Sequence, residues 1–412
     1  MKFHSFNLMP YPYLPDDFTE KHRSVWVDVP ASLYDPVRGH RLYHDYLDQL
    51  VLADKLGFDG ICVNEHHQNA YGLMPSPNLM ASILARSTER AAVVVMGDSV
   101  ALYNPPIRVA EEMAMLDVLS GGRLVAGFPV GTAMDSTFCY GQTPATLRDK
   151  FQEGVELVLR AWSSEEPFSF NGKYTQLRYV NPWPRPIQAP RPPVWVPGSR
   201  SVETWAWCIE NDFLYANLSY FGYAAGKPVM EGFWQTADEM GVERNPYRAG
   251  FLLFVAVADS DAEAEELYAE HALYFYNRCL HVDPGFTNPP GYATIETLRR
   301  GVASQVEAAT KAKAAELTWK DILDRGYVIA GSPSTVAEQL REAATGLHVG
   351  HLMVLLHFGS MPTEVATRNI TQFARDVMPN LRPQFDEWED HWSPSVVDVT
   401  APPEREVQGA RA

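Results

Sequence analysis

Short apolar runs and longer segments of helical periodicity alternate about eight times along the chain, and this alternation limits the possible folds more than any other feature. Such a pattern is typical of βαβ units, which build a parallel sheet with helices packed against it. Eight strand–helix units predict an α/β fold, a closed (β/α)8 TIM barrel. A doubly wound open sheet would use the same elements and is the alternative.

The pattern assigns eight strands and eight helical segments along the chain. The expected strands are residues 3–8, 60–63, 92–99, 124–128, 194–196, 213–217, 251–257 and 352–356. The expected helices are residues 42–56, 78–86, 107–119, 146–162, 201–210, 262–276, 335–344 and 364–377.

Three stretches exceed what a minimal barrel needs, and we expect them as insertions. Residues 9–40 follow the first strand, residues 168–191 precede the fifth strand, and residues 280–317 lie near the seventh. We expect the second insertion to form a hairpin and an irregular loop. Loops this long are usually functional or mobile, although an ordinary surface excursion is the alternative.

After Arg382 the composition changes. Residues 386–412 carry seven acidic residues and two arginines with little periodicity, so we divide the chain into a barrel, 1–385, and an acidic C-terminal arm or tail, 386–412. Trp388 and Trp392 in this arm could pack on a neighbour.

The charge of the chain argues against two classes of partner. The formal net charge of −17 repels nucleic acid and anionic membrane surfaces. The four cysteines lie about 70 residues apart with no CxxC pair, which indicates reduced thiols. No secretory signal and no long apolar stretch is apparent, so we expect a cytoplasmic protein.

The densest group of reactive side chains is the sequence NEHHQN, residues 64–69, directly after the second strand. The carboxyl ends of barrel strands face the active site, where a neutral histidine can exchange protons near pH 7. A purely structural histidine pair is one alternative. Zinc is another, but adjacent histidines point in different directions and no third ligand has standard spacing, so we expect no metal.

Two further strand ends carry polar groups. The fifth strand is followed by Gly198, Ser199, Arg200 and Ser201 at the start of a helix, where backbone N–H groups, hydroxyls and a guanidinium would bind a phosphate. An ordinary serine N-cap is the simpler alternative. The third strand ends in Gly97–Asp98, a carboxylate that is either solvated or functional.

At these residues the chain resembles the bacterial luciferase-like flavin monooxygenases, which are (β/α)8 barrels that use reduced FMN and dioxygen. The shared segments keep their order along most of the chain. They are residues 1–6, 57–73 with its EHH sequence, 106–128, 193–206, GSPSTVAEQL from Gly331 and FARDVMPNL from Phe373.

The resemblance implies roles for individual residues. His66 matches the active-site histidine of the family, and Ser199 with its neighbours matches the phosphate-binding strand end. Gly97–Asp98 matches the position of a cis peptide bond behind the flavin ring, so we expect one there.

The chain departs from the luciferase pattern in two places. Pro129 and Val130 stand where the luciferase has a Cys-Arg pair by the flavin and its phosphate, and we expect Arg200 to replace the lost cation. The insertion 9–40 has no counterpart there and would overhang the substrate side with Trp26, Asp28 and Tyr34, so light emission from a long-chain aldehyde is poorly supported.

The resemblance implies an FMN-dependent monooxygenase that acts through a flavin C4a-peroxide, with O2 as co-substrate and a separate NAD(P)H:flavin reductase. His66 would act as acid or base, Asn64 and Asp98 would orient it or the flavin, and residues 280–317 would close as a lid. A homodimer or homotetramer is expected through helices near the second and third units.

Two other functions stay open on the same fold. One is a deazaflavin-dependent oxidoreductase without oxygen chemistry, and the other is a non-catalytic flavin-binding subunit. The expected substrate is small and apolar, cyclic, heteroaromatic or carbonyl-bearing, because aromatic and methionine side chains line the predicted site. The expected substrate-binding residues are Phe6, Trp26, Tyr71 and Met74.

Overall fold

The computed structural model describes residues 1–198, 202–218, 220–292, 317–395 and 397. Within this part of the chain, eight parallel strands close into a barrel in the order β1-β2-β3-β4-β7-β8-β9-β11, and β11 pairs with β1. The predicted (β/α)8 barrel is therefore confirmed, and the open-sheet alternative is excluded. The barrel strands are β1 Lys2–Phe6, β2 Gly60–Val63, β3 Ala92–Val95, β4 Leu124–Gly127, β7 Val194–Gly198, β8 Leu214–Asn217, β9 Ala249–Val257 and β11 His351–Leu355.

Helices surround the barrel, and several begin where the sequence supplies a cap. Asp35 accepts hydrogen bonds from the backbone N–H groups of Val37 and Arg38 at the start of α2, with Pro36 in its first turn. The outer helices are α2 Pro36–Lys55, α3 Pro77–Ser87, α4 Ile107–Ser120, α5 Pro144–Ser163, α6 Val202–Glu210, α7 Gly222–Glu239, α8 Asp261–Tyr274, α12 Pro333–Leu347 and α13 Thr363–Gln372.

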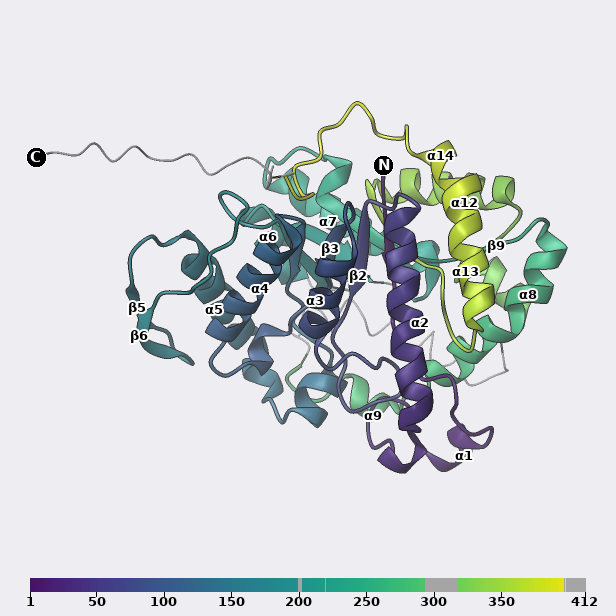
Figure 1. Ribbon diagram of the computed structural model, residues 1–412, viewed down its shortest axis with the longest axis horizontal. Coiled ribbons are helices and arrows are strands. Elements are labelled where there is room, and N and C mark those ends of the chain that lie inside the picture. The colour runs from purple at the N-terminus through teal and green to yellow at the C-terminus, as the bar shows by residue number, and fades with distance from the viewer. Residues whose placement is uncertain (199–201, 219, 293–316, 396, 398–412) are drawn as a thin grey trace, which may run out of the picture.

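The shorter elements belong to the insertions and to the C-terminal segment. In Figure 1 the hairpin β5–β6 projects from the barrel beside α5, as expected for residues 168–191. The short strands are β5 Phe168–Asn171, β6 Gln176–Val180 and β10 Val328–Gly331. The short helices are α1 Phe18–Lys21, α9 Pro284–Thr287, α11 Trp319–Asp324 and α14 Met378–Leu381, with π-helical turns at Met134–Cys139, Phe275–Cys279 and Phe373–Val377.

The sequence pattern missed α7 and β10, for different physical reasons. α7 contains Pro228 and several glycines, which normally break a helix. One of them, Gly226, is needed because a Cβ there would lie 2.3 Å from the Phe251 ring, so the glycine lets the helix approach the barrel. β10 has only four residues and pairs with the far end of β9 outside the closed ring.

The two ends of the barrel differ in what covers them. In Figure 1 the start of β1 and α14 lie at one end, which we name the floor, and α1 and α9 lie at the opposite end. The loops after the strands open at this second end. No helix in the described part of the chain is long and apolar enough to cross a membrane.

Candidate active site

Two glycines bring the ends of β3 and β4 into close contact. A Cβ on Gly97 would lie 1.9 Å from the carbonyl oxygen of Gly127, and a Cβ on Gly127 would lie 2.1 Å from that of Val95. The backbone N–H of Asp98 donates to the Gly127 oxygen at 3.0 Å. Only glycine can occupy these two positions, so the strand ends form a surface without side chains.

The cis peptide bond lies one residue earlier than we expected. It joins Met96 to Gly97, whereas the prediction placed it between Gly97 and Asp98. The predicted strand 92–99 likewise ends at Val95, because the chain turns away there. The N–H of Asp98 is held by β4, so Asp98 continues the contact between the two strands.

His66 lies after β2, and its ring packs against two aromatic side chains that stack on each other, Trp26 and Tyr71, with centroids 3.9 Å apart. Its Nδ1 is 3.0 Å from Oδ2 of Asp135, and its backbone N–H donates to the carbonyl oxygen of Met74 at 3.0 Å. The ring centroid is 5.1 Å from that of Trp26 and 4.8 Å from that of Tyr71. The structure thus brings His66 together with three of the four predicted substrate residues, Trp26, Tyr71 and Met74.

Asp135 is the residue that the sequence reasoning missed. It lies in the π-helical turn Met134–Cys139, eight residues beyond β4, where no periodicity marks it. Its carboxylate also accepts hydrogen bonds from Thr132 Oγ1 at 2.9 Å and from the backbone N–H of His67 at 2.8 Å. Burial alone raises the pKa of this carboxyl, but His66 and these hydrogen bonds outweigh burial and hold the pKa below its usual range.

A second carboxylate holds the neighbouring histidine. Oε1 of Glu65 is 2.8 Å from Nε2 of His67, and Oε2 accepts the backbone N–H of Ser99 at 2.6 Å. The Tyr103 hydroxyl lies 3.3 Å from Glu65 and 3.1 Å from Oδ1 of Asp98. These bonds connect the loops after β2 and β3 into one buried network.

Asp98 is fully buried within this network. Its Oδ2 accepts a hydrogen bond from Asn78 at 2.8 Å. Burial raises the pKa of Asp98 well above its usual range, and the nearby charge of Glu65 raises it further. Both causes favour the protonated form of the Asp98 carboxyl.

The predicted residue Asn64 also lies at the end of β2 and is 3% exposed. Its Oδ1 is buried and has no hydrogen-bond partner among the described residues. A buried carbonyl oxygen normally has a donor, so this orphan acceptor marks a place where a ligand N–H would be favourable.

The predicted phosphate site is only partly described. Ser199, Arg200 and Ser201 lie outside the described residues, whereas Gly198 ends β7 and is half-buried. Near it, Nη1 of Arg148 on α5 donates to Thr204 Oγ1 in α6 at 3.1 Å. The sequence reasoning missed Arg148 because it lies within the periodic pattern of a helix.

The other predicted cofactor and substrate residues occupy the same end of the barrel. Pro129 and Val130 lie two and three residues beyond the end of β4 and are half-buried. Phe6 ends β1 and is 2% exposed, so its ring belongs to the packed core. The Trp26 side chain is held by a hydrogen bond, in which its indole N–H donates to the carbonyl oxygen of Cys279 at 3.2 Å.

Two insertions form a roof over this end. The backbone N–H of Val25 donates to the oxygen of His281 at 2.8 Å, and that of Asp283 donates to Arg23 at 2.9 Å, which gives a short antiparallel bridge. Tyr292 reaches the loop after β4, where its hydroxyl donates to the carbonyl oxygen of Gly131 at 2.5 Å. Of the predicted lid 280–317, residues 293–316 lie outside the described part of the chain.

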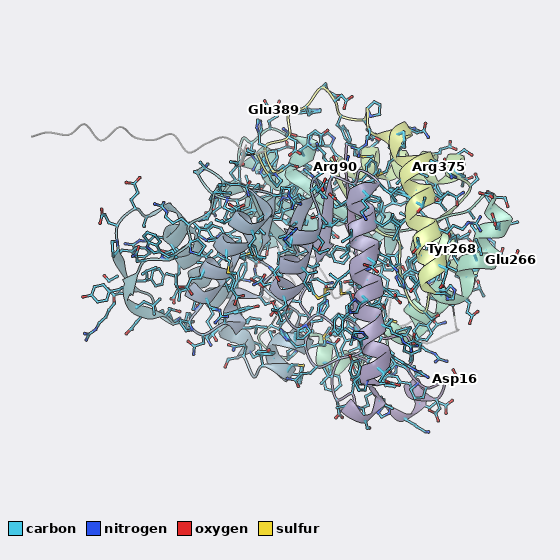
Figure 2. All side chains as sticks on the ribbon, viewed as in Figure 1. Asp16, Arg90, Glu266, Tyr268, Arg375 and Glu389 are labelled. Carbon is cyan, nitrogen blue, oxygen red and sulfur yellow. The ribbon has the colours of Figure 1, made fainter. Side chains whose placement is uncertain are left out.

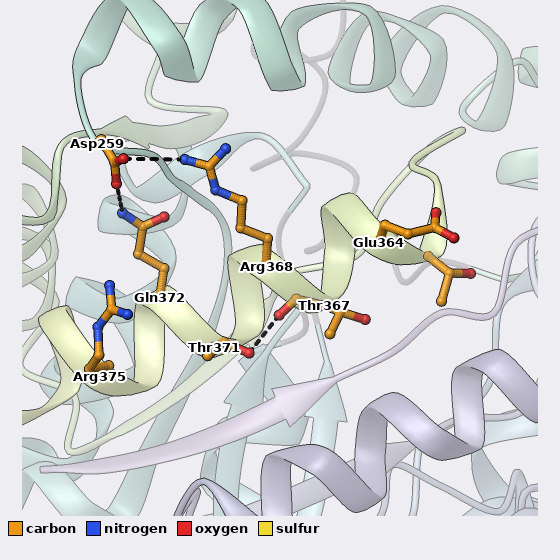
Figure 3. Close-up of a pocket in the computed structure, with 8 residues that line it drawn as sticks. Asp259, Glu364, Thr367, Arg368, Thr371, Gln372 and Arg375 are labelled. Carbon is orange, nitrogen blue, oxygen red and sulfur yellow. Dashed lines mark hydrogen bonds and ion pairs between the residues drawn. The ribbon is translucent and has the colours of Figure 1, made fainter.

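A surface hollow of about 550 Å³ beside α13 is a weaker candidate for an active site, because its charged and polar groups pair with one another (Figure 3). Its Arg368 pairs with Glu263 at 2.8 Å and with Asp259 at 3.6 Å. The Gln372 amide also donates to Asp259, at 2.8 Å. In the described residues no group of three or more His, Cys, Asp or Glu side chains is arranged to hold a metal ion.

Comparison with known proteins identifies the family of this chain. The family model described as luciferase-like monooxygenase matches residues 26–348. The oxygenase component of the flavin-dependent trigonelline monooxygenase of Acinetobacter baylyi is 26% identical over 245 residues, 58% of this chain and 65% of the relative. An F420-dependent glucose-6-phosphate dehydrogenase of Intrasporangium calvum is 24% identical over 347 residues, 82% of this chain and 95% of the relative.

A solved structure has the same fold. The oxygenating constituent of 3,6-diketocamphane monooxygenase from Pseudomonas putida, a type II Baeyer-Villiger enzyme in complex with FMN, gives a TM-score of 0.67 with 21% identity. The superposition covers 92% of this chain and 98% of that chain. With the family match over most of the chain, the resemblance predicted from the sequence is confirmed: the chain belongs to the luciferase-like monooxygenase family and is an enzyme of that class.

Proposed function

We propose that this protein is an FMN-dependent monooxygenase that uses reduced FMN and O2 to oxidise a small apolar substrate, cyclic, heteroaromatic or carbonyl-bearing. The observation that carries the proposal is the His66 ring, which is held by Asp135 at 3.0 Å and packs against the stacked rings of Trp26 and Tyr71. This geometry provides an acid–base nitrogen in a largely aromatic setting.

The strand ends fit a flavin. The contact between Gly97 and Gly127 leaves a surface without side chains, against which a flat ring can lie, and the orphan Oδ1 of Asn64 is an acceptor for an imide N–H. At the phosphate end, Arg148 beside Thr204 supplies a cation. When bound, reduced FMN supplies the electrons and activates dioxygen. We assign to its site Gly97, Asp98, Pro129, Val130, Gly198 and Arg148, together with the predicted Ser199, Arg200 and Ser201.

The remaining roles belong to the protein. His66 gives or takes a proton at Nε2, Asn64 orients the bound flavin, and Asp98 fixes the strand ends behind the flavin through its hydrogen bonds with Asn78 and Tyr103. Trp26 and Tyr71 exclude water and contact the apolar substrate. The described part of the roof, residues 280–292, covers this end, as the lid hypothesis requires.

Replacement of His66 by alanine tests the acid–base role. We expect FMN to bind with unchanged affinity, measured by quenching of flavin fluorescence. Incorporation of 18O from labelled O2 should fall by roughly 10²-fold or more, with ring ketones and N-heteroaromatic compounds as substrates and mass spectrometry as readout. Unchanged coupling of reduced FMN oxidation to labelled product would show that His66 has no role in proton transfer.

A deazaflavin-dependent oxidoreductase is the second candidate, because one relative is named F420-dependent. Parallel optical titrations with reduced FMN and with reduced F420 separate the two cofactors. Tight binding of F420 alone, without incorporation of 18O, would favour the second candidate. Binding of FMN without any oxygen consumption would instead favour a non-catalytic flavin-binding subunit.

We propose that a separate NAD(P)H:flavin reductase delivers the reduced FMN, as the name "oxygenase component" of the trigonelline relative supports for that protein. Mixing the protein with FMN and NADH should consume no oxygen until an unrelated flavin reductase is added. We also place the protein in the cytoplasm, where reducing conditions would keep its four free cysteines as thiols.

We propose a homodimer through α3 and α4, consistent with the expectation of a homodimer or homotetramer. Five apolar side chains on these adjoining helices are 45–68% exposed: Leu79, Ile83, Met115, Val118 and Leu119. Their spacing of three and four residues places them on one face of each helix. The double variant with Leu79→Glu and Met115→Glu should elute as a monomer with light-scattering detection, whereas an unchanged mass would exclude this surface.

A further inference from the structure

We propose that Asp135 is a positioning residue that fixes the tautomer of His66, so that Nε2 is the nitrogen that exchanges protons at the active site. The inference rests on the proposed function only in its last step, the use of Nε2 in catalysis. The tautomer itself follows from the hydrogen bonds around the Asp135 carboxylate.

The first step is that this carboxylate is an acceptor on every side. Oδ2 receives the hydroxyl of Thr132 at 2.9 Å and faces Nδ1 of His66 at 3.0 Å. Oδ1 receives the backbone N–H of His67 at 2.8 Å and the side-chain amide of Asn69 at 3.4 Å. A carboxylate surrounded by donors stays ionised and has no proton to give, so Nδ1 of His66 must be the donor.

The second step concerns the other nitrogen. With the proton of a neutral imidazole on Nδ1, the lone pair is on Nε2. Nε2 has no hydrogen-bond partner among the described residues, and the ring keeps about 10% of its surface exposed. The stacked rings of Trp26 and Tyr71 contact one side of the His66 ring, and the hydrogen bond to Asp135 holds Nδ1, so the ring has little freedom to turn.

The neighbouring histidine shows that the arrangement is specific to His66. His67 is held through the opposite nitrogen, because its Nε2 lies 2.8 Å from Oε1 of Glu65. Its ring packs on Tyr140, with centroids 4.3 Å apart, and the residue is 3% exposed. The two adjacent histidines are thus each held by a carboxylate, but through different ring nitrogens. Of the two, only His66 has its Nε2 left without a carboxylate partner.

The structure also predicts what an amide would do in place of this carboxylate. In Asp135→Asn the backbone N–H of His67 and the amide of Asn69 still require an oxygen on the Oδ1 side. The new NH2 group must then occupy the Oδ2 side, where it donates toward Nδ1 of His66 and the hydroxyl of Thr132. His66 can accept that bond only if its proton moves to Nε2, which reverses the tautomer.

Nitrogen-15 NMR of protein labelled in its histidines reads the tautomer directly, without flavin or substrate. The spectrum of His66→Gln identifies the His66 signals among the 12 histidines. We expect His66 to be protonated on Nδ1 in the wild type and on Nε2 in Asp135→Asn. The matched control is Glu65→Gln, the same change at the carboxylate of His67, which should leave the His66 signals in place.

An Nε2-protonated His66 in the wild type would overturn the inference, and this result requires no variant to fold. An unchanged tautomer in folded Asp135→Asn would also overturn it. With reduced FMN, we expect 18O incorporation by Asp135→Asn to fall by about 10² to 10⁴-fold with FMN affinity unchanged. A reversed tautomer with undiminished product would support the positioning by Asp135 and contradict the proposed catalytic role of His66.

Discussion

Both ends of the barrel hold a histidine beside an aspartate, yet the two pairs are built for different purposes. At the end where the loops after the strands open, which we name the active end, Nδ1 of His66 is 3.0 Å from Asp135. The His66 ring keeps a small exposed edge among aromatic residues. At the floor Nε2 of His351 is 3.5 Å from Asp390, its other nitrogen is 3.0 Å from His4, and both rings are almost completely buried. The same two residue types thus form the proposed acid–base site at one end and a buried packing contact at the other.

The floor is closed by the C-terminal arm, here residues 386–395. The carbonyl oxygen of Trp392 accepts the indole N–H of Trp195 at 2.9 Å, and Arg248 lies 4.6 Å over the Trp392 ring. Figure 2 shows Glu389 of this arm at the opposite end of the molecule from Asp16, which lies near the roof. A (β/α)8 barrel allows this separation, because its active sites lie at the carboxyl ends of the strands and its opposite end serves stability.

The largest expected effect is at the active end, for Gly97→Ala. Its Cβ would lie 1.9 Å from a backbone oxygen that has no room to move, so we expect a loss of at least roughly 3 kcal/mol in unfolding free energy and loss of FMN binding. Denaturant unfolding and flavin fluorescence measure the two effects.

Gly346→Ala in α12 is the control for Gly97→Ala, because nothing lies within 4 Å of its Cβ. It should stabilise the protein by about 0.5–1 kcal/mol, since alanine favours a helix. A Gly97→Ala variant as stable as the wild type would mean that β3 and β4 can separate.

The next effect is at the floor, for Trp392→Ala. The side chain is 4% exposed, so its removal leaves a cavity and should lower the unfolding free energy by about 3 kcal/mol. FMN affinity should not change, because the arm is at the other end. Tyr179→Ala, at a side chain that is 84% exposed, should change stability little; equal losses in both variants would show that the arm does not hold the floor.

The strands were predictable because buried parallel strands leave short apolar runs in the sequence, and all eight expected strands are barrel strands. His66 was predictable because it directly follows such a run. Asp135 was not, since it lies in an irregular turn that only the closed barrel brings beside His66.

The arm shows the same limit of sequence reasoning. Its acidic, aperiodic composition predicts a tail, and the division at residue 385 stays a prediction. The burial of Trp392 depends on Trp195 and Arg248, which lie more than 140 residues away in sequence. Contacts at such separation leave no local pattern.

Acid should weaken the floor through His4. Burial, with a smaller contribution from the nearby His351, lowers the pKa of His4 to about 3, whereas an unfolded histidine titrates near 6.5. Below pH 6.5 the His4 side chain binds a proton in the unfolded chain but not in the folded chain. The contribution of His4 to the free energy of unfolding is therefore fully present above this pH and is lost as the pH falls below it. At pH 5 the loss should be roughly 2 kcal/mol.

Urea unfolding at pH 7, 6 and 5 measures the acid effect. His4→Gln should flatten the dependence, and so should His357→Gln, because burial lowers the pKa of His357 to about 4. Parallel slopes in His4→Gln and wild type would contradict the role of the floor.

The smallest expected effect tests whether one hydrogen bond, rather than general packing, holds the arm against the floor. Trp195→Phe removes the indole N–H that binds Trp392 and should cost about 1–2 kcal/mol, because the Trp392 oxygen stays buried without a donor. Trp162→Phe is a close control, since its buried indole donates to Ala110 at 3.0 Å on the outside of the barrel. Hydrogen exchange should rise over residues 386–395 in Trp195→Phe alone. Faster exchange over these residues in both variants, or in neither, would show that the indole N–H of Trp195 does not hold the arm against the floor.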